Sequence, residues 1–246
     1  MKSKIIIYGD LHGCLDEFLA LRNKINPSLD DREIIIGDIL DKGPFPIELL
    51  RFLRENGIDS IMGNHEDKYL RYKKHYDAFV KQGIEIPMGF SDEKLAIFNS
   101  LTEEDFEYLK SLPYYKKIDN LTLVHGGITN NMNLDKLSNK NLKILLRLRF
   151  LQENNIMSHT AHKNKYNVRW SELYDGNQGI VIYGHEAYEN VRYDKYAIGI
   201  DTGCVYGNIL SAIVVTDTKN PMENHKIIQV DAKATYRIKL EENEVD

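Results

Sequence analysis

The sequence is poor in cysteine and in long apolar runs. It has only two cysteines in 246 residues, Cys14 and Cys204, too few for a disulfide framework, which fits the reducing cytoplasm. Its longest apolar runs, such as Ile5–Tyr8 and Ala212–Val215, fall far short of the roughly 20 residues that a membrane helix needs. The first of these runs is also too short for a signal peptide. We therefore expect a cytoplasmic protein with no membrane partner.

An excess of positive charge is also missing. Lysine and arginine number 32 against 37 acidic residues, and the net charge of −5 argues against stable binding of nucleic acid by bulk charge. With 42% apolar and 28% charged residues, the composition is that of a folded globular protein and not of a disordered one. The length suits one large domain or two small ones.

The first third of the chain repeats one local pattern, in which a short apolar strand runs into a Gly-Asp or Gly-Asn turn and then into a helix. The expected strands are Lys4–Tyr8, Glu33–Ile36 and Asp59–Met62. The helix after the first turn has one face formed by Leu15, Phe18, Leu19, Arg22 and Ile25. The helix after the second turn is opened by Pro44 and Pro46, with the inward residues Leu49, Leu50 and Leu53. Alternating elements of this length predict a layered α/β fold in which helices cover the sheet.

The rest of the chain is expected to complete a single domain, residues 1–246. Residues 67–113 have a helical, polar pattern, in which Ser91 and Thr102 mark helix starts. Residues 128–179 are irregular and are expected to form a cap insertion over the site, because no linker flanks them. Further strands are expected at Tyr115–Ile118, Leu121–Val124, Ile180–Tyr183, Tyr196–Ile200, Ile209–Val215 and Lys226–Val230.

Residue types that ligate metals stand where these strands end, which is where open α/β sheets bind ligands. The residues are Asp10, His12, Asp38, Asp41, Asn64, His65, His125 and His185. Each Gly-Asp or Gly-Asn pair gives a tight turn that directs a short oxygen ligand back over the sheet. Carboxylates, an amide oxygen and imidazoles, without cysteine, suit a pair of divalent ions better than structural zinc. Such a pair clamps a phosphoryl group and lowers the pKa of a bridging water, so no serine or cysteine nucleophile is required.

Five motifs, in chain order, carry a resemblance to a known family. They are Gly9-Asp10-x-His12-Gly13, Gly37-Asp38-x-x-Asp41-x-Gly43, Gly63-Asn64-His65-Glu66, His125-Gly126-Gly127 and Gly184-His185. The series resembles that of the phosphoprotein phosphatase superfamily of metallophosphoesterases, which includes bacterial Ser/Thr phosphatases and symmetrical diadenosine tetraphosphatases. The resemblance covers Ile5 to about Val215. It implies a calcineurin-like α/β (four-layer α+β) fold, with a central β-sandwich flanked by helices and metals at the carboxyl ends of the strands.

The resemblance also implies a role for each motif residue. The implied ligands are Asp10 and His12 for the first ion, Asn64, His125 and His185 for the second, and Asp38 as the bridge between them. His65 is the implied general acid, oriented by Asp41. Glu66, in the same motif as His65, either orients a neighbour or caps a helix. The two divalent ions are expected to be manganese, with iron, zinc or cobalt as alternatives.

Three positions near the motifs bear on substrate binding. Lys42 stands where the family usually has arginine, so it keeps the charge on the substrate phosphate but loses the bidentate fork. Glu186 stands where the family often has threonine and adds negative charge beside the metals. Arg169, which precedes Trp170, matches a position where a family arginine contacts the substrate phosphate, and a structural arginine is the alternative.

The substrate class stays open between two possibilities. Asp41 is the protein-phosphatase form of its motif, whereas the run Asp201–Leu210 is similar to the closing strand of the tetraphosphatase-like branch. We expect a phosphorylated protein or a nucleotide as substrate, with a Ser/Thr phosphatase-like enzyme first and a symmetrical bis(5'-nucleosyl)-tetraphosphatase as the alternative. A scaffold that has lost catalysis is a remote third, because the ligand set and the His65/Asp41 pair are complete.

Other residues have a structural interpretation beside a functional one. Arg147 and Arg149 point in different directions if both belong to a helix, so at most one is expected to face the site. Cys14 follows a motif but lies outside the ligand set, which favours a packing role. His159 and His162 suit a solvated cap better than a metal site.

Overall fold

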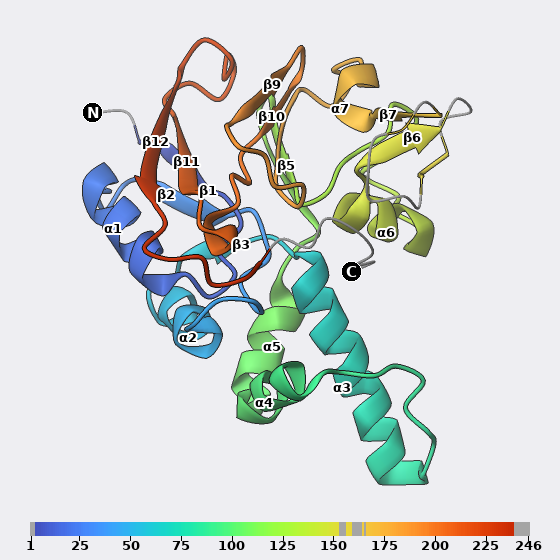
Figure 1. The fold of residues 1–246 in the computed structure, drawn as a ribbon. Coiled ribbons are helices and arrows are strands. Elements are labelled where there is room, and N and C mark those ends of the chain that lie inside the picture. Colours follow the sequence, from blue (N-terminus) through green and yellow to red (C-terminus); the bar gives the residue numbers. More distant parts are fainter. Residues whose placement is uncertain (1–2, 153–155, 159–163, 165, 239–246) are drawn as a thin grey trace.

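The computed structural model describes residues 3–152, 156–158, 164 and 166–238, and it consists of two five-stranded sheets with helices outside them (Figure 1). The first sheet has, in spatial order, β12 (His225–Asp231), β11 (Ile209–Val215), β1 (Ile5–Tyr8), β2 (Arg32–Ile35) and β3 (Asp59–Ser60). The strands β1, β2 and β3 are parallel, and β11 runs antiparallel to β1 and to β12.

The second sheet repeats this mixed arrangement. Its strands are, in spatial order, β4 (Tyr115–Ile118), β5 (Leu121–Val124), β8 (Ile180–Tyr183), β10 (Ala197–Gly199) and β9 (Arg192–Asp194). The three central strands are parallel and the two edge strands are antiparallel to their neighbours. In both sheets the parallel strands therefore bring their carboxyl ends, and the motifs that follow them, to one edge.

Strand alternation explains why the two sheets pack face to face. Along β1, Ile5 and Ile7 belong to an apolar cluster with residues of the second sheet, such as Leu123 and Ile182. The intervening Ile6 and Tyr8 belong to the cluster that the helices cover, because successive side chains point to opposite faces of a strand. The α/β four-layer architecture with a central β-sandwich is confirmed.

The helices cover the outer faces of this sandwich. They are α1 (Leu15–Ile25), α2 (Pro46–Glu55), α3 (Asn64–Gln82), α4 (Asp92–Ser100), α5 (Glu103–Ser111), α6 (Asn139–Arg147) and α7 (Trp170–Leu173), with a 3₁₀ turn, η1 (Cys204–Tyr206). In Figure 1, α1 and α2 lie on the outer side of the first sheet. The inward leucines of α2 are as predicted, but the helix begins at Pro46 and Pro44 lies outside it.

The expected buried face of α1 is wrong at one position. Leu19 is 38% exposed, whereas Leu21 is fully buried. The hydroxyl of Tyr236 and the backbone N–H of Lys233 both donate to Oε1 of Glu17 on α1, which is also buried. These C-terminal residues therefore give the buried carboxylate of Glu17 its hydrogen-bond partners, which the local periodicity of the helix does not reveal.

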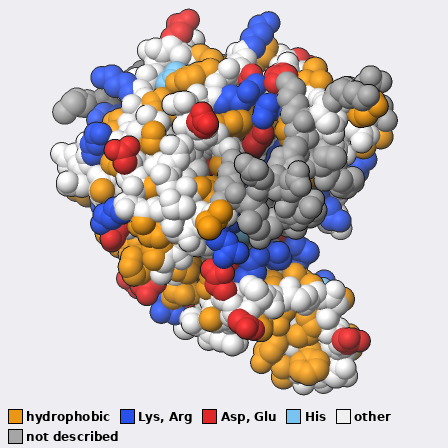
Figure 2. All heavy atoms as spheres, viewed as in Figure 1, with side chains coloured by type: hydrophobic (Ala, Val, Ile, Leu, Met, Phe, Trp, Pro, Cys, Tyr) orange, Lys and Arg blue, Asp and Glu red, His pale blue; other side chains and the backbone are white. Residues whose placement is uncertain are grey.

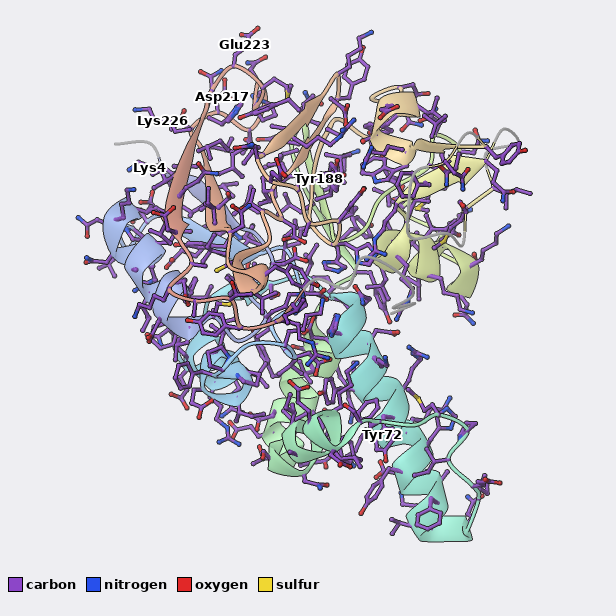
Figure 3. The ribbon with its side chains drawn as sticks, viewed as in Figure 1. Lys4, Tyr72, Tyr188, Asp217, Glu223 and Lys226 are labelled. Carbon is purple, nitrogen blue, oxygen red and sulfur yellow. The ribbon has the colours of Figure 1, made fainter. Side chains whose placement is uncertain are left out.

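The distal half of α3 projects from the sandwich together with α4 (Figure 1). Ser91 and Thr102 cap α4 and α5 through their side chains, as predicted. Tyr72 of α3, labelled in Figure 3, stacks on Phe90 with ring centroids 4.0 Å apart and meets Phe98 of α4 edge-on at 4.8 Å. Farther along, hydrophobic side chains gather on the surface of this projection (Figure 2), and the exposed ones include Tyr76, Phe79, Val80 and Ile84.

The segment after β5 packs on the second sheet through two glycines. A Cβ on Gly126 would lie 2.6 Å from the backbone nitrogen of Arg147, and one on Gly127 would lie 2.5 Å from Nε1 of Trp170. The absence of these side chains lets α6 and α7 approach the end of β5 closely. A two-stranded sheet, β6 (Phe150–Gln152) with β7 (Asn167–Arg169), joins them. His159 and His162 lie outside the described residues.

No helix in the described part of the chain combines the length and the apolar character needed to cross a bilayer.

Candidate metal centre

Two groups of buried side chains meet at Asp38. Ligand atoms of His12, Asp38 and His65 lie within 4.8 Å of one another, and so do those of Asp38, His125 and His185. Oδ2 of Asp38 lies 3.4 Å from Nε2 of His12, whereas Oδ1 lies 3.2 Å from Nε2 of His125. The two oxygens of one carboxylate thus face two different imidazole groups, which is the arrangement that a bridging ligand requires.

The motif turns hold these side chains in place through unusual backbone angles. His12, Asp38, Asp41, Lys42 and His185 all have positive φ, between 41° and 70°. The backbone N–H of His12 donates to the carbonyl oxygen of Asp38 at 2.7 Å, which ties the first turn to the second. Positive φ costs energy in residues other than glycine, so such a concentration at one edge marks a functional site.

The backbone also fixes which ring nitrogen is available for a metal ion. Nδ1 of His12 lies 3.0 Å from the carbonyl oxygen of Leu40, and Nδ1 of His125 lies 2.9 Å from that of Ile36. A carbonyl only accepts, so both rings donate from Nδ1 and turn Nε2 toward the ligand cluster, where Nε2 is the atom that a neutral ring would offer to a metal ion. Nε2 of His125 lies 2.9 Å from Oδ1 of Asn64, the implied amide ligand.

Asp10, which lies beside the backbone of His185, has a buried oxygen without a hydrogen-bond partner. Its Oδ2 accepts the backbone N–H of His185 at 2.9 Å, whereas Oδ1 is buried without a hydrogen bond. A Cβ on Gly184 would lie 2.0 Å from that Oδ1, so only glycine leaves it room. A carboxylate oxygen in this state needs a cation or a proton.

The charges around the site favour a bound cation. Burial, with Asp201 next, raises the pKa of Asp10 well above its usual range. Burial would do the same to Asp38, but the charges of His125 and His65 hold its pKa well below the usual range. His125 is buried, which opposes its protonation, yet Asp38 raises its pKa to about 9. The carboxylates of Asp10 and Asp38 therefore favour a bound proton or cation at the position where a metal ion would lie.

Two imidazoles are kept neutral, as metal ligation requires. Burial, followed by the charge of Lys42, lowers the pKa of His12 to about 3. Burial, followed by the charge of Arg149, lowers the pKa of His185 well below its usual range. Carboxylate, amide and neutral imidazole donors together fit two divalent cations.

His65 belongs to a buried polar chain. Its Nδ1 lies 2.6 Å from Oδ2 of Asp41, while Nε2 is buried, has no hydrogen-bond partner and lies 3.8 Å from Oδ2 of Asp38. Tyr69 donates to the other oxygen of Asp41, and Nζ of Lys94 lies 3.9 Å from Oδ2 of Asp41. Burial alone would raise the pKa of Asp41, but the hydrogen bonds from His65 and Tyr69 help to keep it below its usual range. Asp41 is therefore ionised, so it can stabilise the imidazolium form of His65 when that form occurs.

Glu66 both caps α3 and holds the second motif turn. Its fully buried carboxylate accepts four backbone N–H groups at 2.9 to 3.1 Å, namely those of Asp38, Ile39, Leu40 and Gly63. The two interpretations that the sequence left open therefore apply together. One side chain fixes Asp38 relative to the turn that carries Asn64 and His65.

We predict that Glu66→Gln lowers the free energy of unfolding by about 2–6 kcal/mol. An amide NH₂ cannot accept a hydrogen bond, so two buried N–H groups lose their partner, at about 1–3 kcal/mol each. Urea unfolding measures the loss. Glu85→Gln makes the same chemical change at an exposed position and is the matched control. Equal stability of Glu66→Gln and the parent would show that the carboxylate does not hold the turn.

Lys42 lies at the ligand cluster, and its contact with a substrate stays a prediction. Its Nζ lies 3.3 Å from Nε2 of His12 and donates to the hydroxyl of Tyr206 at 3.0 Å. The same ammonium group acts on Asp201, where its charge works against the effect of burial on the carboxyl pKa. A cation at this point can meet a phosphate oxygen beside the first half of the metal centre.

We predict that Lys42→Ala lowers kcat/KM about 10-fold or more, since a charge-assisted hydrogen bond contributes about 1.5–3 kcal/mol. Lys42→Arg should keep or raise activity, because it restores the planar fork. Steady-state kinetics on one substrate decides, with the exposed Lys74→Ala as control. Parent-like rates for Lys42→Ala would place the residue outside the substrate site.

Arg169 is brought close to the metal turn but is already paired. Its Nη2 lies 2.9 Å from Oε1 of Glu186, and its guanidinium lies over the rings of Phe150 and Tyr188. Tyr188, labelled in Figure 3, donates to the other oxygen of Glu186 at 2.7 Å. The negative charge of Glu186 is therefore balanced locally. A direct contact between Arg169 and a substrate phosphate stays a prediction.

The premise that Arg147 and Arg149 belong to one helix is wrong. Helix α6 ends at Arg147 and the backbone is extended at Leu148, so helical spacing does not decide which way Arg149 points. The charges of both residues help to lower the pKa of His185, that of Arg149 more strongly. That at most one of the two side chains faces the site stays a prediction.

The family model described as calcineurin-like phosphoesterase matches residues 3–189. The asymmetrical bis(5'-nucleosyl)-tetraphosphatase PrpE of Bacillus velezensis is 29% identical over 248 residues, which cover 94% of this chain and 93% of its own. The protein of the same name from Bacillus subtilis is 29% identical over 227 residues, covering 83% of this chain and 88% of its own.

Solved structures give the same picture. One provisionally assigned as a diadenosine tetraphosphatase has a TM-score of 0.73 and 25% identity, covering 94% of this chain and 95% of its own. A serine/threonine phosphatase from Saccharomyces cerevisiae, described as similar to human PP5, has a TM-score of 0.64 and 19% identity, covering 95% and 81%. This second likeness concerns the fold alone.

Proposed function

The chain belongs to the calcineurin-like phosphoesterase family, and on this premise we propose that it hydrolyses the phosphoanhydride chain of a dinucleoside polyphosphate. The enzyme class, a metal-dependent phosphoester hydrolase, follows from the family and agrees with the prediction from the five motifs. The observation that carries metal-dependent hydrolysis is the position of Asp38. Its two carboxylate oxygens face His12 and His125, one on each side.

We propose that the two divalent cations are manganese. When bound, they would polarise the phosphoryl group and activate the attacking water. The chain provides the rest. Asp10, His12, Asp38, Asn64, His125 and His185 are the proposed ligands. His65 is the proposed acid, which delivers a proton from Nε2 to the leaving oxygen while Asp41 stabilises the imidazolium through Nδ1.

The charge around the site supports a polyphosphate substrate. Lys42 lies beside His12, and Arg147 and Arg149 act on His185, so cationic side chains flank both halves of the proposed centre. A phosphate chain that links two nucleosides spreads several negative charges over its length, whereas a phosphorylated side chain concentrates about two at one point. Separated cations match the extended chain better. The curated relatives named for dinucleoside tetraphosphates support the same choice.

The decisive experiment is product analysis with diadenosine tetraphosphate in the presence of manganese, and then of cobalt, iron or zinc. Formation of ATP and AMP would assign asymmetrical cleavage, which is the label of the relatives, and formation of ADP alone would assign the symmetrical cleavage expected from the motifs. Hydrolysis of phosphopeptides at rates 100-fold higher, about 2.7 kcal/mol in the transition state, would overturn the nucleotide proposal.

A second candidate, a phosphoprotein phosphatase, is favoured by the His65–Asp41 pair. A serine alkoxide is a poor leaving group and needs a proton in the transition state, whereas a nucleotide phosphate leaves readily without one. A buried imidazole 2.6 Å from a carboxylate is thus most useful for an alkyl phosphate ester. The same product assay with a phosphoserine peptide at equal metal loading compares the two candidates directly.

A further inference from the structure

A second cluster of metal-binding side chains lies apart from the proposed dinuclear centre. The sulfur atoms of Cys14 and Cys204 and a carboxylate oxygen of Glu17 all lie within 4.8 Å of one another. All three residues are at most 2% exposed. Cys14 and Cys204 are the two cysteines of the chain, and they meet here although 190 positions separate them in sequence. The packing role expected for Cys14 is present, but packing does not account for the carboxylate beside the sulfurs.

Glu17 supplies the independent observation. Its Oε1 accepts the backbone N–H of Lys233 at 2.9 Å and the hydroxyl of Tyr236 at 2.8 Å. Its Oε2 is buried and has no hydrogen-bond partner. A buried carboxylate oxygen without a partner is costly, because it has lost its water and gained nothing in exchange. The two neighbouring groups that could share a cation with it are thiols.

We propose that Cys14, Glu17 and Cys204 form a binding site for a single zinc ion, separate from the catalytic pair. Two thiolates and one carboxylate are donors that Zn²⁺ prefers, and a tetrahedral ion needs one further ligand. A water or the Tyr236 hydroxyl, which is already bonded to Glu17, can fill that position. Thiolates bind zinc in preference to manganese, which prefers oxygen and nitrogen ligands. The cysteine site and the dinuclear centre should therefore bind different metals.

The site joins three segments that are distant in sequence. Cys14 follows the turn that holds His12, Glu17 lies on α1, and Cys204 begins η1. The same 3₁₀ turn carries Tyr206, whose hydroxyl accepts a hydrogen bond from Lys42. Zinc bound here would therefore link the turn that contains His12 to η1, whose Tyr206 contacts Lys42.

Cobalt substitution tests the site without any use of activity. Thiolate-to-cobalt charge transfer absorbs in the near ultraviolet, and no proposed ligand of the dinuclear centre is a cysteine, so this band reports the new site alone. The full-length protein loaded with Co²⁺ should show the band, and equimolar Zn²⁺ should abolish it. Asp38→Asn should keep the band, whereas Cys204→Ser should lose it.

Metal counting by mass spectrometry provides the second measurement. After equilibration with Zn²⁺, Cys204→Ser should hold one ion fewer per chain than the parent, and Glu17→Gln should bind the ion at least 10-fold more weakly. If the serine variant does not fold, the parent spectrum and its competition by zinc still decide. A parent protein without the cobalt band, or with Cys14 and Cys204 joined in a disulfide, would overturn the proposal.

Discussion

Replacing His65 with asparagine is expected to lower kcat on a phosphoserine peptide by about 10²–10⁴-fold while both metal ions stay bound, which is the usual effect of losing a positioned general acid. The expectation rests on the two ends of the ring. Nδ1 is 2.6 Å from the carboxylate of Asp41, and Nε2 is buried without a hydrogen-bond partner, 3.8 Å from Asp38. A charged imidazole held in this way can give up its proton from Nε2 and stay in place.

The size of this defect should depend on the leaving group. An aryl phosphate leaves as a stable phenolate, so the variant should lose little on such a substrate and most on a phosphoserine peptide. Kinetics with both substrates, together with the metal content of the purified protein, measure the effect. His75→Asn, on the same helix but ten positions farther along, is the matched control. Asp41→Asn should cost less than His65→Asn, because the ring survives and loses only its charged partner.

Two outcomes would contradict the acid role. If His65→Asn loses a metal ion, the side chain is a ligand. The ligand atoms of His12, Asp38 and His65 lie within 4.8 Å of one another, so this outcome is geometrically allowed. If the variant slows every substrate by the same factor, His65 binds phosphate and does not transfer a proton. Either result would also remove the argument for the phosphoprotein candidate, while leaving the nucleotide proposal to stand on its own product assay.

The parts of the fold that local sequence determines were predictable. β5 and β8 were predicted to the residue, because short apolar runs between turns leave little freedom. The caps of α4 and α5 at Ser91 and Thr102 were predicted from residue type alone. By contrast, β9, an edge strand with exposed Tyr193, has no apolar run and was missed.

The parts that depend on distant segments were not predictable. The burial of Glu17 on α1 depends on its hydrogen-bond partners Tyr236 and Lys233, which are more than 200 positions away. Glu66 could not be given one role from sequence, because three of its four partners belong to the preceding motif. Tyr69 and Lys94 are partners of Asp41 because the fold brings α3 and α4 beside the second motif turn, which local sequence does not predict.

Asp38→Asn is expected to remove both metal ions together and to reduce activity by at least about 10³-fold, which corresponds to about 4 kcal/mol in the transition state. An amide is neutral and has a single acceptor oxygen, so it cannot serve the two groups that lie 3.4 Å and 3.2 Å from the two carboxylate oxygens. The backbone should tolerate the change, because asparagine adopts a φ near +51° more readily than most residues. Metal counting after dialysis and circular dichroism separate loss of ions from loss of fold.

Asp10→Asn gives the graded comparison that makes this prediction sharp. The unpartnered Oδ1 of Asp10 serves one half of the proposed centre, and its Oδ2 is already engaged by the backbone of His185. Asp10→Asn should therefore weaken the binding of one ion and leave the binding of the other unchanged, so titration with manganese should show one strong and one weak site. The Asp38 variant should show two weak sites. Two ions bound undiminished by Asp38→Asn would exclude the bridge, because no other described carboxylate lies within ligand distance of both imidazole groups.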